Sequence, residues 1–379
     1  MTSFSGWIAL SLMILAFYFA IRSPFLNRLF GELKLQLQWH HYVGFACTAA
    51  TLWHVGQLLW DFREAWHLLW LDLSVITGWI SFIGLTLVII FSFFRTAISY
   101  RLWRKIHLIS SASLVAALIH TYLIYEPAAQ REWLIFLGFV ALGFIAFVFT
   151  AILPRFRFWG KAYLISQHQE LRPGYFLTSL QVQNLKQSIS IESGQFIYLR
   201  FLDKRFTRIW HPFTIVSTNP QHDIGLLIKA RGQDTNQLAD LRLPTHVKVW
   251  GPFGSRFWKH DDNQLWISYG VGVAIFLGAI RSYPENFQKK VHFICCDGSE
   301  DKVFFRDELE KCGQAHPGFS WEVFIGSGYE FIQAFDKRSL SSKNDLLVRI
   351  CGHPGFQNSV KMKLIAKGIP RSKIHLEGL

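Results

Sequence analysis

Cysteine is scarce in this sequence, and the spacing of the few cysteines excludes two kinds of site. The five residues are Cys47, Cys295, Cys296, Cys312 and Cys351. They form no C-x2-C pairs of the kind that hold zinc, and neither their number nor their placement is typical of a disulfide scaffold. We therefore expect reduced thiols.

Charged residues are also scarce, at 17% of the chain, whereas 51% of the residues are hydrophobic, including 15 Trp and 35 Phe. A membrane part is therefore expected. Acidic residues are outnumbered by basic ones, 26 to 39, which by itself fits a nucleic-acid partner or an anionic membrane surface. No groove-reading or RNA-stacking motif, internal repeat or low-complexity segment occurs, so we expect no nucleic-acid partner.

Five apolar runs reach or approach the roughly 20 residues that a spanning helix needs. They extend over about Phe4 to Ile21, Trp39 to Trp60, Leu73 to Phe94, Leu102 to Tyr125 and Trp133 to Leu153. The first run has no basic residue before it and no cleavage pattern after it, so it does not indicate a signal peptide. Basic residues follow the first, third and fifth runs, which predicts an outside N-terminus and a cytoplasmic location for everything after Pro154.

After Lys161 the pattern changes to short strands separated by turn residues, which predicts an all-β barrel or sandwich. From Gln264 onward strands alternate with helices, which predicts a parallel, doubly wound α/β sheet. The expected fold is thus multi-domain: a five-span α-helical transmembrane bundle, an all-β barrel and a Rossmann-like domain. We place these domains at residues 1–154, 155–260 and 261–379.

Four histidines lie inside two apolar runs, where ionisable side chains are costly and often functional. His40 and His54 are 14 residues apart, so on a helix they lie within about 40° of the same face and about 21 Å apart along the axis. His107 and His120 are 13 residues apart, a spacing that misses the same face by about 140°. A bulge or kink, for example in the serine-rich stretch 110–113, would be required there.

Two histidines from facing helices can hold a six-coordinate, electron-transferring haem. Both helices run from inside to outside, so we pair His40 with His107 near the cytoplasm and His54 with His120 near the outside. The alternative, that each histidine only hydrogen-bonds a neighbouring helix, stays open. His41 cannot point the same way as His40, and we predict that it faces elsewhere.

Two cytoplasmic stretches have residues suited to a nucleotide. HPFTIVST begins at His211, and in the following IKARGQDTNQL Lys229 could pair with a phosphate, while Gly232 and Thr235 could shape an oxyanion-binding turn. A β-barrel turn needs Gly and Thr in any case, so a purely structural role is an alternative.

Two further stretches lie where parallel sheets bind ligands. YGVGVAIFLGAI places Gly270 and Gly272 between a strand and a helix, where backbone amides favour a pyrophosphate, although the full G-x-G-x-x-G is not present. CGHPGF follows another parallel strand, and its Cys351 either packs or lines a nicotinamide pocket.

The ordered set GQF, HPFT, K-x-x-G-x-x-T, GPFG, the glycine turn, CGHPGF and IPRSKIHLEGL resembles the ferredoxin-NADP reductase module. Behind histidine-paired membrane helices, it resembles the NADPH oxidase and ferric reductase family, particularly its compact bacterial members. The resemblance covers nearly the whole chain. It implies electron flow from cytosolic NADH or NADPH to FAD and through two b-type haems to oxygen or ferric iron outside.

The resemblance also implies site residues. Those that match haem ligands are His40, His54, His107 and His120. Those that match the FAD site are His211, Pro212, Phe213, Thr214, Lys229, Gly232 and Thr235. Those that match the NAD(P) site are Gly270, Gly272, Cys351, Gly352 and Pro354. No catalytic residue beyond the cofactors is implied.

The expected protein is therefore a multi-pass plasma-membrane NAD(P)H oxidase whose reductase domains lie in the cytoplasm. Its expected partners are membrane lipids, NAD(P)H and the acceptor, with no obligatory protein partner. The alternatives are a ferric-chelate reductase of the same architecture and a membrane-anchored flavin reductase in which the histidines are structural.

Four departures from the family stand out. The family often has six spans, whereas five are expected here. Ile275 replaces a usual proline, and Leu379 ends the chain where an aromatic would stack on the flavin. Where members that prefer NADPH have an arginine, this chain has Cys296 and Asp297, and a carboxylate there favours NADH because it repels a 2′-phosphate.

Overall fold

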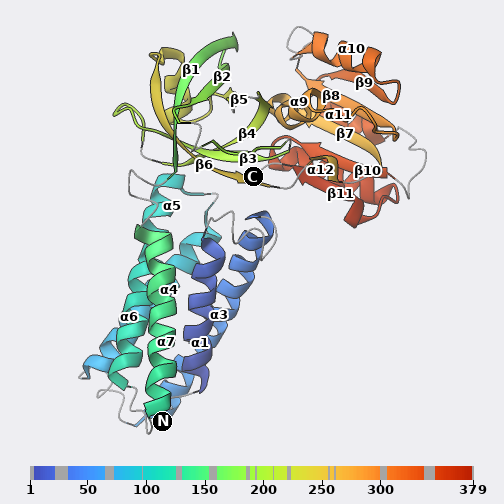
Figure 1. The fold of residues 1–379 in the computed structure, drawn as a ribbon. Helices are drawn as coiled ribbons and strands as arrows, with labels where there is room; N and C mark the ends of the chain where they lie inside the picture. Colours follow the sequence, from blue (N-terminus) through green and yellow to red (C-terminus); the bar gives the residue numbers. More distant parts are fainter. Residues whose placement is uncertain are drawn as a thin grey trace. The chain divides into compact units, whose positions relative to one another are not determined.

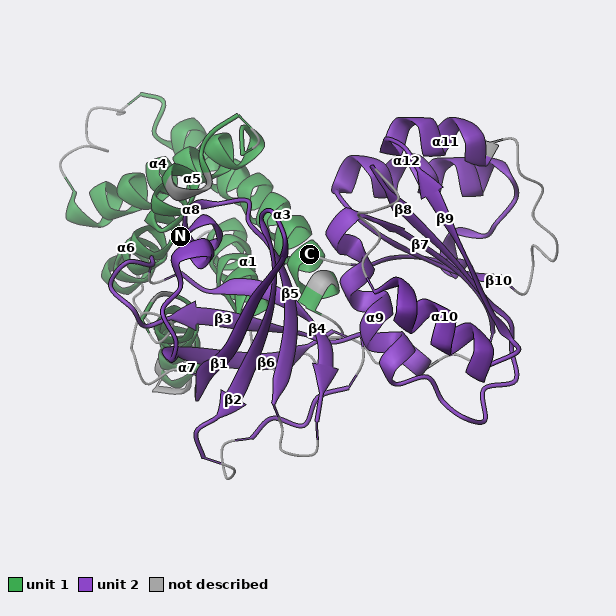
Figure 2. Cartoon of the chain, turned by 90° about the horizontal axis from the view of Figure 1, so that it is seen from above, with its two compact units in different colours: residues 1–159 green, residues 160–379 purple. Residues whose placement is uncertain are grey.

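The computed structural model divides the chain into two compact units, residues 1–159 and 160–379 (Figure 2). The described residues are 4–21, 33–64, 72–95, 97–124, 130–152, 160–184, 188–192, 194–207, 209–219, 223–254, 257–259, 262–298, 305–336 and 346–377. The predicted three-part division after residues 154 and 260 remains a prediction, since the β and α/β parts pack within the second unit.

Unit 1 is a bundle of apolar helices (Figure 1). Its helices are α1 (Phe4–Ala20), α3 (Leu33–Asp61), α4 (Leu73–Phe93), α5 (Tyr100–His107), α6 (Ile109–Ile124) and α7 (Gln130–Phe147), the last followed by a π-helical turn, Val148–Ile152. Each of the five predicted runs overlaps one helix, except that the fourth overlaps both α5 and α6. A core that includes Leu10, Met13, Ile14, Cys47 and Leu114 holds the helices together.

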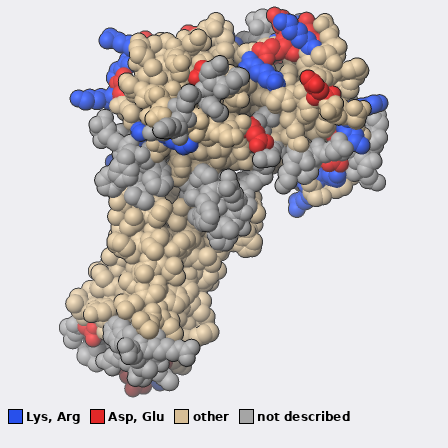
Figure 3. Space-filling model, in the orientation of Figure 1, with Lys and Arg blue, Asp and Glu red and all other residues tan. Residues whose placement is uncertain are grey.

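The outer surface of unit 1 is apolar. Trp39, Tyr42, Phe45 and Phe144 are among many large side chains that are about half exposed or more, and the visible face of the helices has few charged side chains (Figure 3). Such a surface is typical of contact with lipid. Within the described segments, Leu73–Phe93 and the α5–α6 stretch from Leu102 to Ile124 are long and apolar enough to cross a membrane, whereas Phe4–Ala20 and Leu134–Thr150 are apolar but shorter.

Unit 2 begins with a closed barrel, as the short apolar strands predicted. Its strands are β1 (Lys161–Arg172), β2 (Tyr175–Val182), β3 (Phe196–Phe201), β4 (His211–Thr218), β5 (Ile224–Lys229) and β6 (Thr245–Phe253). They pair antiparallel in the order β1-β2-β5-β4-β3-β6. Side chains that alternate inward, among them Tyr163, Ile197, Leu199, Leu226 and Val249, fill the interior.

The second part of unit 2 is the predicted parallel sheet. Its strands are β7 (Asn263–Tyr269), β8 (Val291–Asp297), β9 (Phe319–Ile325), β10 (Leu346–Cys351) and β11 (Ile374–Glu377), in the order β11-β10-β7-β8-β9. Its helices are α9 (Val273–Arg281), α10 (Arg306–Ala315), α11 (Gly328–Asp336) and α12 (Pro354–Ala366). The order reverses between β7 and β10, and ligands of such sheets bind beside the carboxyl ends of the strands at this switch point.

Barrel and sheet share one hydrophobic core. Val216 and Leu227 of the barrel belong to the same buried cluster as Trp266 of β7 and Phe276 of α9. Helix α9 lies directly on β4, because a Cβ added to Gly278 would be only 2.8 Å from the Ile215 carbonyl oxygen. The strand that begins with HPFT is therefore packed against the helix that follows the glycine turn.

A buried ion pair holds the last strand in place. Arg349 of β10 is only 2% exposed; its Nη1 donates to Glu377 Oε1 at 2.5 Å and its Nη2 to the Phe257 carbonyl at 2.8 Å. Its guanidinium also lies 4.3 Å from the centroid of the Phe257 ring. Removing the carboxylate would leave a buried charge without its counter-ion.

We expect Glu377→Ala to destabilise unit 2 by about 3–5 kcal/mol, because breaking a buried pair by removing one partner is costly. Thermal unfolding of the full chain in detergent, followed by circular dichroism, should show a midpoint lower by roughly 10 °C. Arg205→Ala is the control, because Arg205 and Asp203 form a similarly short pair, 2.7 Å, that is well exposed, and its midpoint should stay within about 2 °C. Equal shifts for both variants would contradict this prediction.

Candidate functional site

The structure brings the four intramembrane histidines together in the two pairs that the spacing predicted. The ring centroids of His40 and His107 are 6.0 Å apart, with an interplanar angle of 67°. Those of His54 and His120 are 6.2 Å apart, with an angle of 70°. The first pair lies toward the start of α3 and the end of α5, and the second lies further along α3 and α6. Each pair thus joins the same two parts of the bundle at a different level.

The ring separations fit a metal ion between each pair. Two metal–nitrogen bonds of about 2 Å each, with a ring centroid about 1 Å behind each nitrogen, set two imidazoles about 6 Å apart. Haem iron is already surrounded by porphyrin nitrogens, so two axial histidines complete its coordination. Across the described segments no group of three or more His, Cys, Asp and Glu could hold a metal ion.

Backbone carbonyls fix one ring of each pair. His40 Nδ1 lies 2.8 Å from the Ala16 carbonyl oxygen of α1, and His120 Nδ1 lies 2.6 Å from the Ser74 carbonyl oxygen of α4. Because a carbonyl can only accept, Nδ1 carries the hydrogen in both rings, and Nε2 keeps its lone pair for a metal. Such partners orient a histidine ligand and raise its basicity.

The other ring of each pair is held differently. His107 stacks on Trp103, with centroids 4.8 Å apart, and its Nδ1 is buried without a hydrogen-bond partner. His54 Nδ1 lies 3.4 Å from the Ser5 hydroxyl, which donates to Gln57 Oε1 at 2.5 Å. At each level of the bundle, one imidazole therefore contacts a backbone carbonyl through Nδ1, whereas the ring of the other contacts side chains.

The predicted helix irregularity occurs between His107 and the serines. Helix α5 ends at His107 and α6 begins at Ile109, with Leu108 between them. The Ser110 hydroxyl donates to the His107 carbonyl at 2.6 Å, which satisfies an acceptor that the interruption frees. This break changes the rotation of His120 relative to His107 about the helix axis. Two histidines 13 residues apart can therefore lie opposite His40 and His54.

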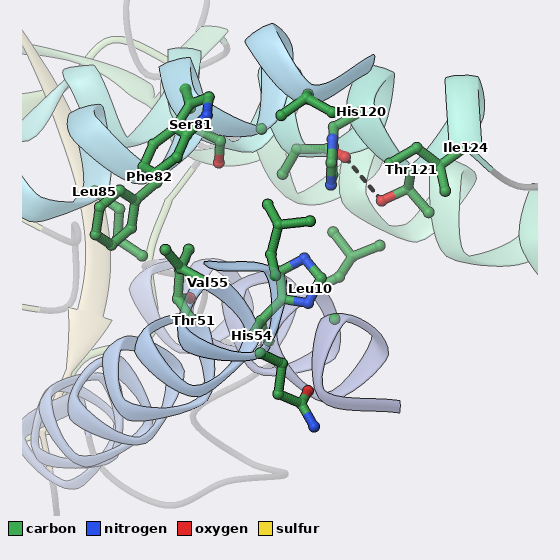
Figure 4. Close-up of a pocket in the computed structure, with 18 of the residues that line it drawn as sticks. Leu10, Thr51, His54, Val55, Ser81, Phe82, Leu85, His120, Thr121 and Ile124 are labelled. Atoms are coloured by element: carbon green, nitrogen blue, oxygen red, sulfur yellow. Dashed lines mark hydrogen bonds between the residues drawn. The ribbon is translucent and has the colours of Figure 1, made fainter. Parts of the chain in front are cut away.

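Glycines make room around the pairs. A Cβ on Gly78 of α4 would lie 2.8 Å from His120 Cε1, so only glycine admits this ring so close to the helix. At Gly44, one turn after His40, an added Cβ would meet nothing within 4 Å. A cavity of about 280 Å³ adjoins the second pair, and His54 and His120 point into it from opposite sides (Figure 4). His41 is exposed.

In the barrel, the HPFT motif forms the first half of β4. His211 Nε2 donates to Asp234 Oδ2 at 2.7 Å, and this carboxylate, 3% exposed, also accepts from the Thr207 backbone N–H at 2.8 Å and from the Thr207 hydroxyl. Asp234 therefore fixes the orientation of the His211 ring. Thr214 is half-buried and lies opposite Phe196 of β3.

The other residues expected near FAD lie on β4, β5 and the turn that follows. Pro212 is exposed and Phe213 packs against the barrel core. Lys229 is exposed at the end of β5. The Thr235 hydroxyl accepts from the N–H groups of Arg231 and Gly232, both at 2.9 Å, so it holds the turn itself, which is the structural role that the sequence left open.

The glycine turn and the CGHPGF stretch meet at the switch point of the sheet. Gly270 has a φ of +57°, which glycine adopts most readily. A Cβ on Gly272 would lie within 2.9 Å of backbone atoms of Cys351 and Gly352. Pro354 is the first residue of α12, so α9 and α12 both begin beside this contact.

The expected NADH preference required an open carboxylate at Asp297. The structure does not show one. Asp297 is 8% exposed, and its Oδ2 accepts from Arg172 Nη2 of β1 at 3.1 Å. No local sequence pattern predicts this pair, because the two residues are far apart in the chain. Leu379, the other departure near the flavin, lies outside the described residues.

Several supporting residues were not predicted from the sequence. The Ala16 and Ser74 carbonyls are backbone groups, which no side-chain pattern identifies. Asp234 stands in the GQDTNQL stretch, in which the sequence pattern assigned a role only to Gly232 and Thr235. An acidic residue shortly after β5, the strand that follows the one beginning with His211, is a signal that could have identified it.

Comparisons with known proteins match one family within unit 1 and another within unit 2. Residues 5–119 match the family described as ferric reductase like transmembrane component, and residues 175–272 match an FAD-binding domain. The electron transfer subunit of dihydroorotate dehydrogenase B (NAD(+)) from Shouchella clausii is 25% identical over 187 residues, which cover 45% of this chain and 71% of that protein. Mouse NADPH oxidase 1 is 29% identical over 118 residues, which cover 29% of this chain and 20% of that protein.

A solved structure, the CS-b5R domains of human Ncb5or in the NAD+ form, is 21% identical with a TM-score of 0.49 and covers 58% of this chain and 70% of its own.

Cys351 allows a test of the environment at the switch point. Burial first, and the negative charge of Glu377 second, raise the pKa of its thiol to about 12. A raised pKa keeps the thiol protonated at all lower pH values, so we expect Cys351 to react with iodoacetamide far more slowly than glutathione at pH 8 and to accelerate only toward pH 12. Mass spectrometry of the alkylated chain measures this, and Glu377→Gln should speed the reaction. A Cys351 that reacts as fast as glutathione at pH 8 would contradict the assignment.

Proposed function

Because the chain belongs to the NADPH oxidase and ferric reductase family, we propose that it is a transmembrane flavocytochrome b. It moves electrons from NAD(P)H through FAD and two b-type haems to an acceptor on the other side of the membrane. The observation that carries this proposal is the pair of imidazole contacts, 6.0 and 6.2 Å between centroids, at two levels of one apolar bundle.

The chain's own residues position the cofactors. His40 with His107, and His54 with His120, would hold the two haems, and the Ala16 and Ser74 carbonyls keep Nε2 of one ring at each level available. When bound, flavin accepts an electron pair from NAD(P)H and haem iron carries single electrons. The helical rise between His40 and His54 is about 21 Å, so the two histidine pairs that would hold the haems lie at two separate levels of the bundle.

Residues of unit 2 would hold FAD and NAD(P)H. Strand β4, oriented at His211 by Asp234, would face the flavin, and the turn after Lys229 would lie near its phosphates. The glycine turn and Cys351 would receive the nicotinamide cofactor. A protonated Cys351 offers a neutral surface there, and the core shared by barrel and sheet keeps both binding regions in one packing unit.

The proposed topology has five spans in the plasma membrane, with unit 2 in the cytoplasm. The loop charges support this orientation. As acceptor we propose dioxygen, with superoxide as product, and the likeness to mouse NADPH oxidase 1 supports this choice. A ferric-chelate reductase would need the same bundle and differs only at the outer haem edge.

Haem content tests the assignment directly. We expect the purified full chain to show b-type Soret and α bands in its reduced-minus-oxidised spectrum, and His40→Leu and His107→Leu each to halve the haem per chain, because both remove a ligand of the same haem. His54→Leu and His120→Leu should remove the other haem.

His41→Leu is the matched control and should leave both haems in place, since the His41 side chain is exposed. Wild-type protein without b-type bands would reject transmembrane electron transfer and favour the membrane-anchored flavin reductase. Loss of haem in His41→Leu but not in His40→Leu would reverse the ligand choice.

The acceptor is tested with the same preparation. If dioxygen is reduced, cytochrome c reduction driven by NAD(P)H should be largely inhibited by superoxide dismutase, because superoxide is then the carrier. Faster reduction of a ferric chelate, unaffected by superoxide dismutase and by removal of oxygen, would instead identify a ferric-chelate reductase.

A further inference from the structure

Arg172 and Asp297 form an ion pair between the barrel and the sheet. Arg172 is the last residue of β1, and Asp297 is the last residue of β8. The Nη2–Oδ2 distance is 3.1 Å, and the two side chains are only 15% and 11% exposed. Asp297 Oδ1 accepts from the Gly298 backbone N–H at 2.7 Å. Both carboxylate oxygens therefore have partners within the protein.

The position of this pair matters for dinucleotide recognition. In doubly wound sheets an acidic residue after the second strand binds the ribose 2′-hydroxyl of NAD, whereas a nearby arginine accommodates the 2′-phosphate of NADP. Here Asp297 ends β8, the neighbour of the strand that leads into the glycine turn. The barrel supplies an arginine to the same point, so the two types of residue occur together and neutralise each other.

A second cation lies next to this pair. The guanidinium of Arg172 is 4.1 Å from the centroid of the Tyr175 ring, and Lys229 Nζ is 5.1 Å from the same centroid. The Tyr175 hydroxyl is 4.0 Å from the position of a Cβ on Gly270. The Tyr175 ring therefore holds two cations beside the glycine turn, and only one of them is paired with Asp297.

We propose that Arg172 determines which nicotinamide dinucleotide the chain accepts, an inference that rests on the proposed NAD(P)H-oxidising function. Unpaired, the Asp297 carboxylate would repel a 2′-phosphate. Paired with Arg172, it has little net charge, and the guanidinium can donate to a phosphate oxygen. The chain then accepts NADPH as well as NADH, and loss of Arg172 makes it selective for NADH.

The test compares binding of AMP and 2′-phospho-AMP to the full chain in detergent by calorimetry, which requires no turnover. Arg172→Met keeps the apolar stem and removes the charge. We expect this substitution to lower the affinity for 2′-phospho-AMP at least tenfold relative to the affinity for AMP. The affinity for AMP itself should change less than threefold. The ratio of kcat/KM for NADPH to that for NADH should fall in parallel. Asp297→Asn should change the binding ratio in the opposite direction.

Arg281→Met is the matched control. Arg281 also joins sheet to barrel, since its Nη1 donates to the Val216 carbonyl at 3.2 Å, but it ends α9, away from the glycine turn. Its binding ratio should equal that of the wild type. An unchanged ratio in Arg172→Met would overturn the proposal, and if that variant does not fold, an unchanged ratio in Asp297→Asn does the same. Wild-type protein that binds neither nucleotide, NADH nor NADPH would instead reject the proposed electron donor itself.

Discussion

Polar rings inside an apolar bundle need partners, and this requirement governs the architecture of unit 1. A buried polar group without a partner costs about 1–3 kcal/mol. The partners of His40 and His120 are carbonyls of α1 and α4, so ring orientation depends on how these helices pack on α3 and α6. The most extensive helix contacts of the unit are those of α1 with α3 and of α4 with α6. The packing of the helices therefore determines the orientation of the imidazoles. It does so through backbone carbonyls and through the close approach of the His120 ring to Gly78.

Unit 2 depends on a different constraint, the close packing of backbone at a point where strand order reverses. Gly272 can have no side chain because the end of β10 occupies that space, and Gly278 can have none because β4 does. These two contacts place the start of α9 beside Cys351 and its body beside the HPFT strand. The positions of the two proposed cofactor-binding regions therefore depend on Gly272 and Gly278, where only glycine fits.

The sequence predicted the periodic features well. The five apolar runs, the antiparallel barrel and the parallel sheet all follow from the spacing of apolar residues, and the 13-residue spacing of His107 and His120 correctly predicted a helix irregularity. Helix α11 was missed, although Ser327 and Glu330 form a capping box at its start, with N–H to side-chain distances of 2.6 and 3.2 Å. The Arg172–Asp297 pair could not be predicted, because a contact over such a sequence separation has no local pattern and depends on how the barrel packs on the sheet.

The buried cluster that joins Val216 and Leu227 to Trp266 and Phe276 also bears on how such a chain can be inherited or rearranged. A gene fusion that acquired only the barrel would expose the barrel side of this cluster to water, and a fusion that acquired only the sheet would expose the side formed by the sheet and α9. Exposed apolar surface of this kind promotes aggregation. Recombination would therefore favour transfer of the barrel and the sheet together, as one unit of the gene.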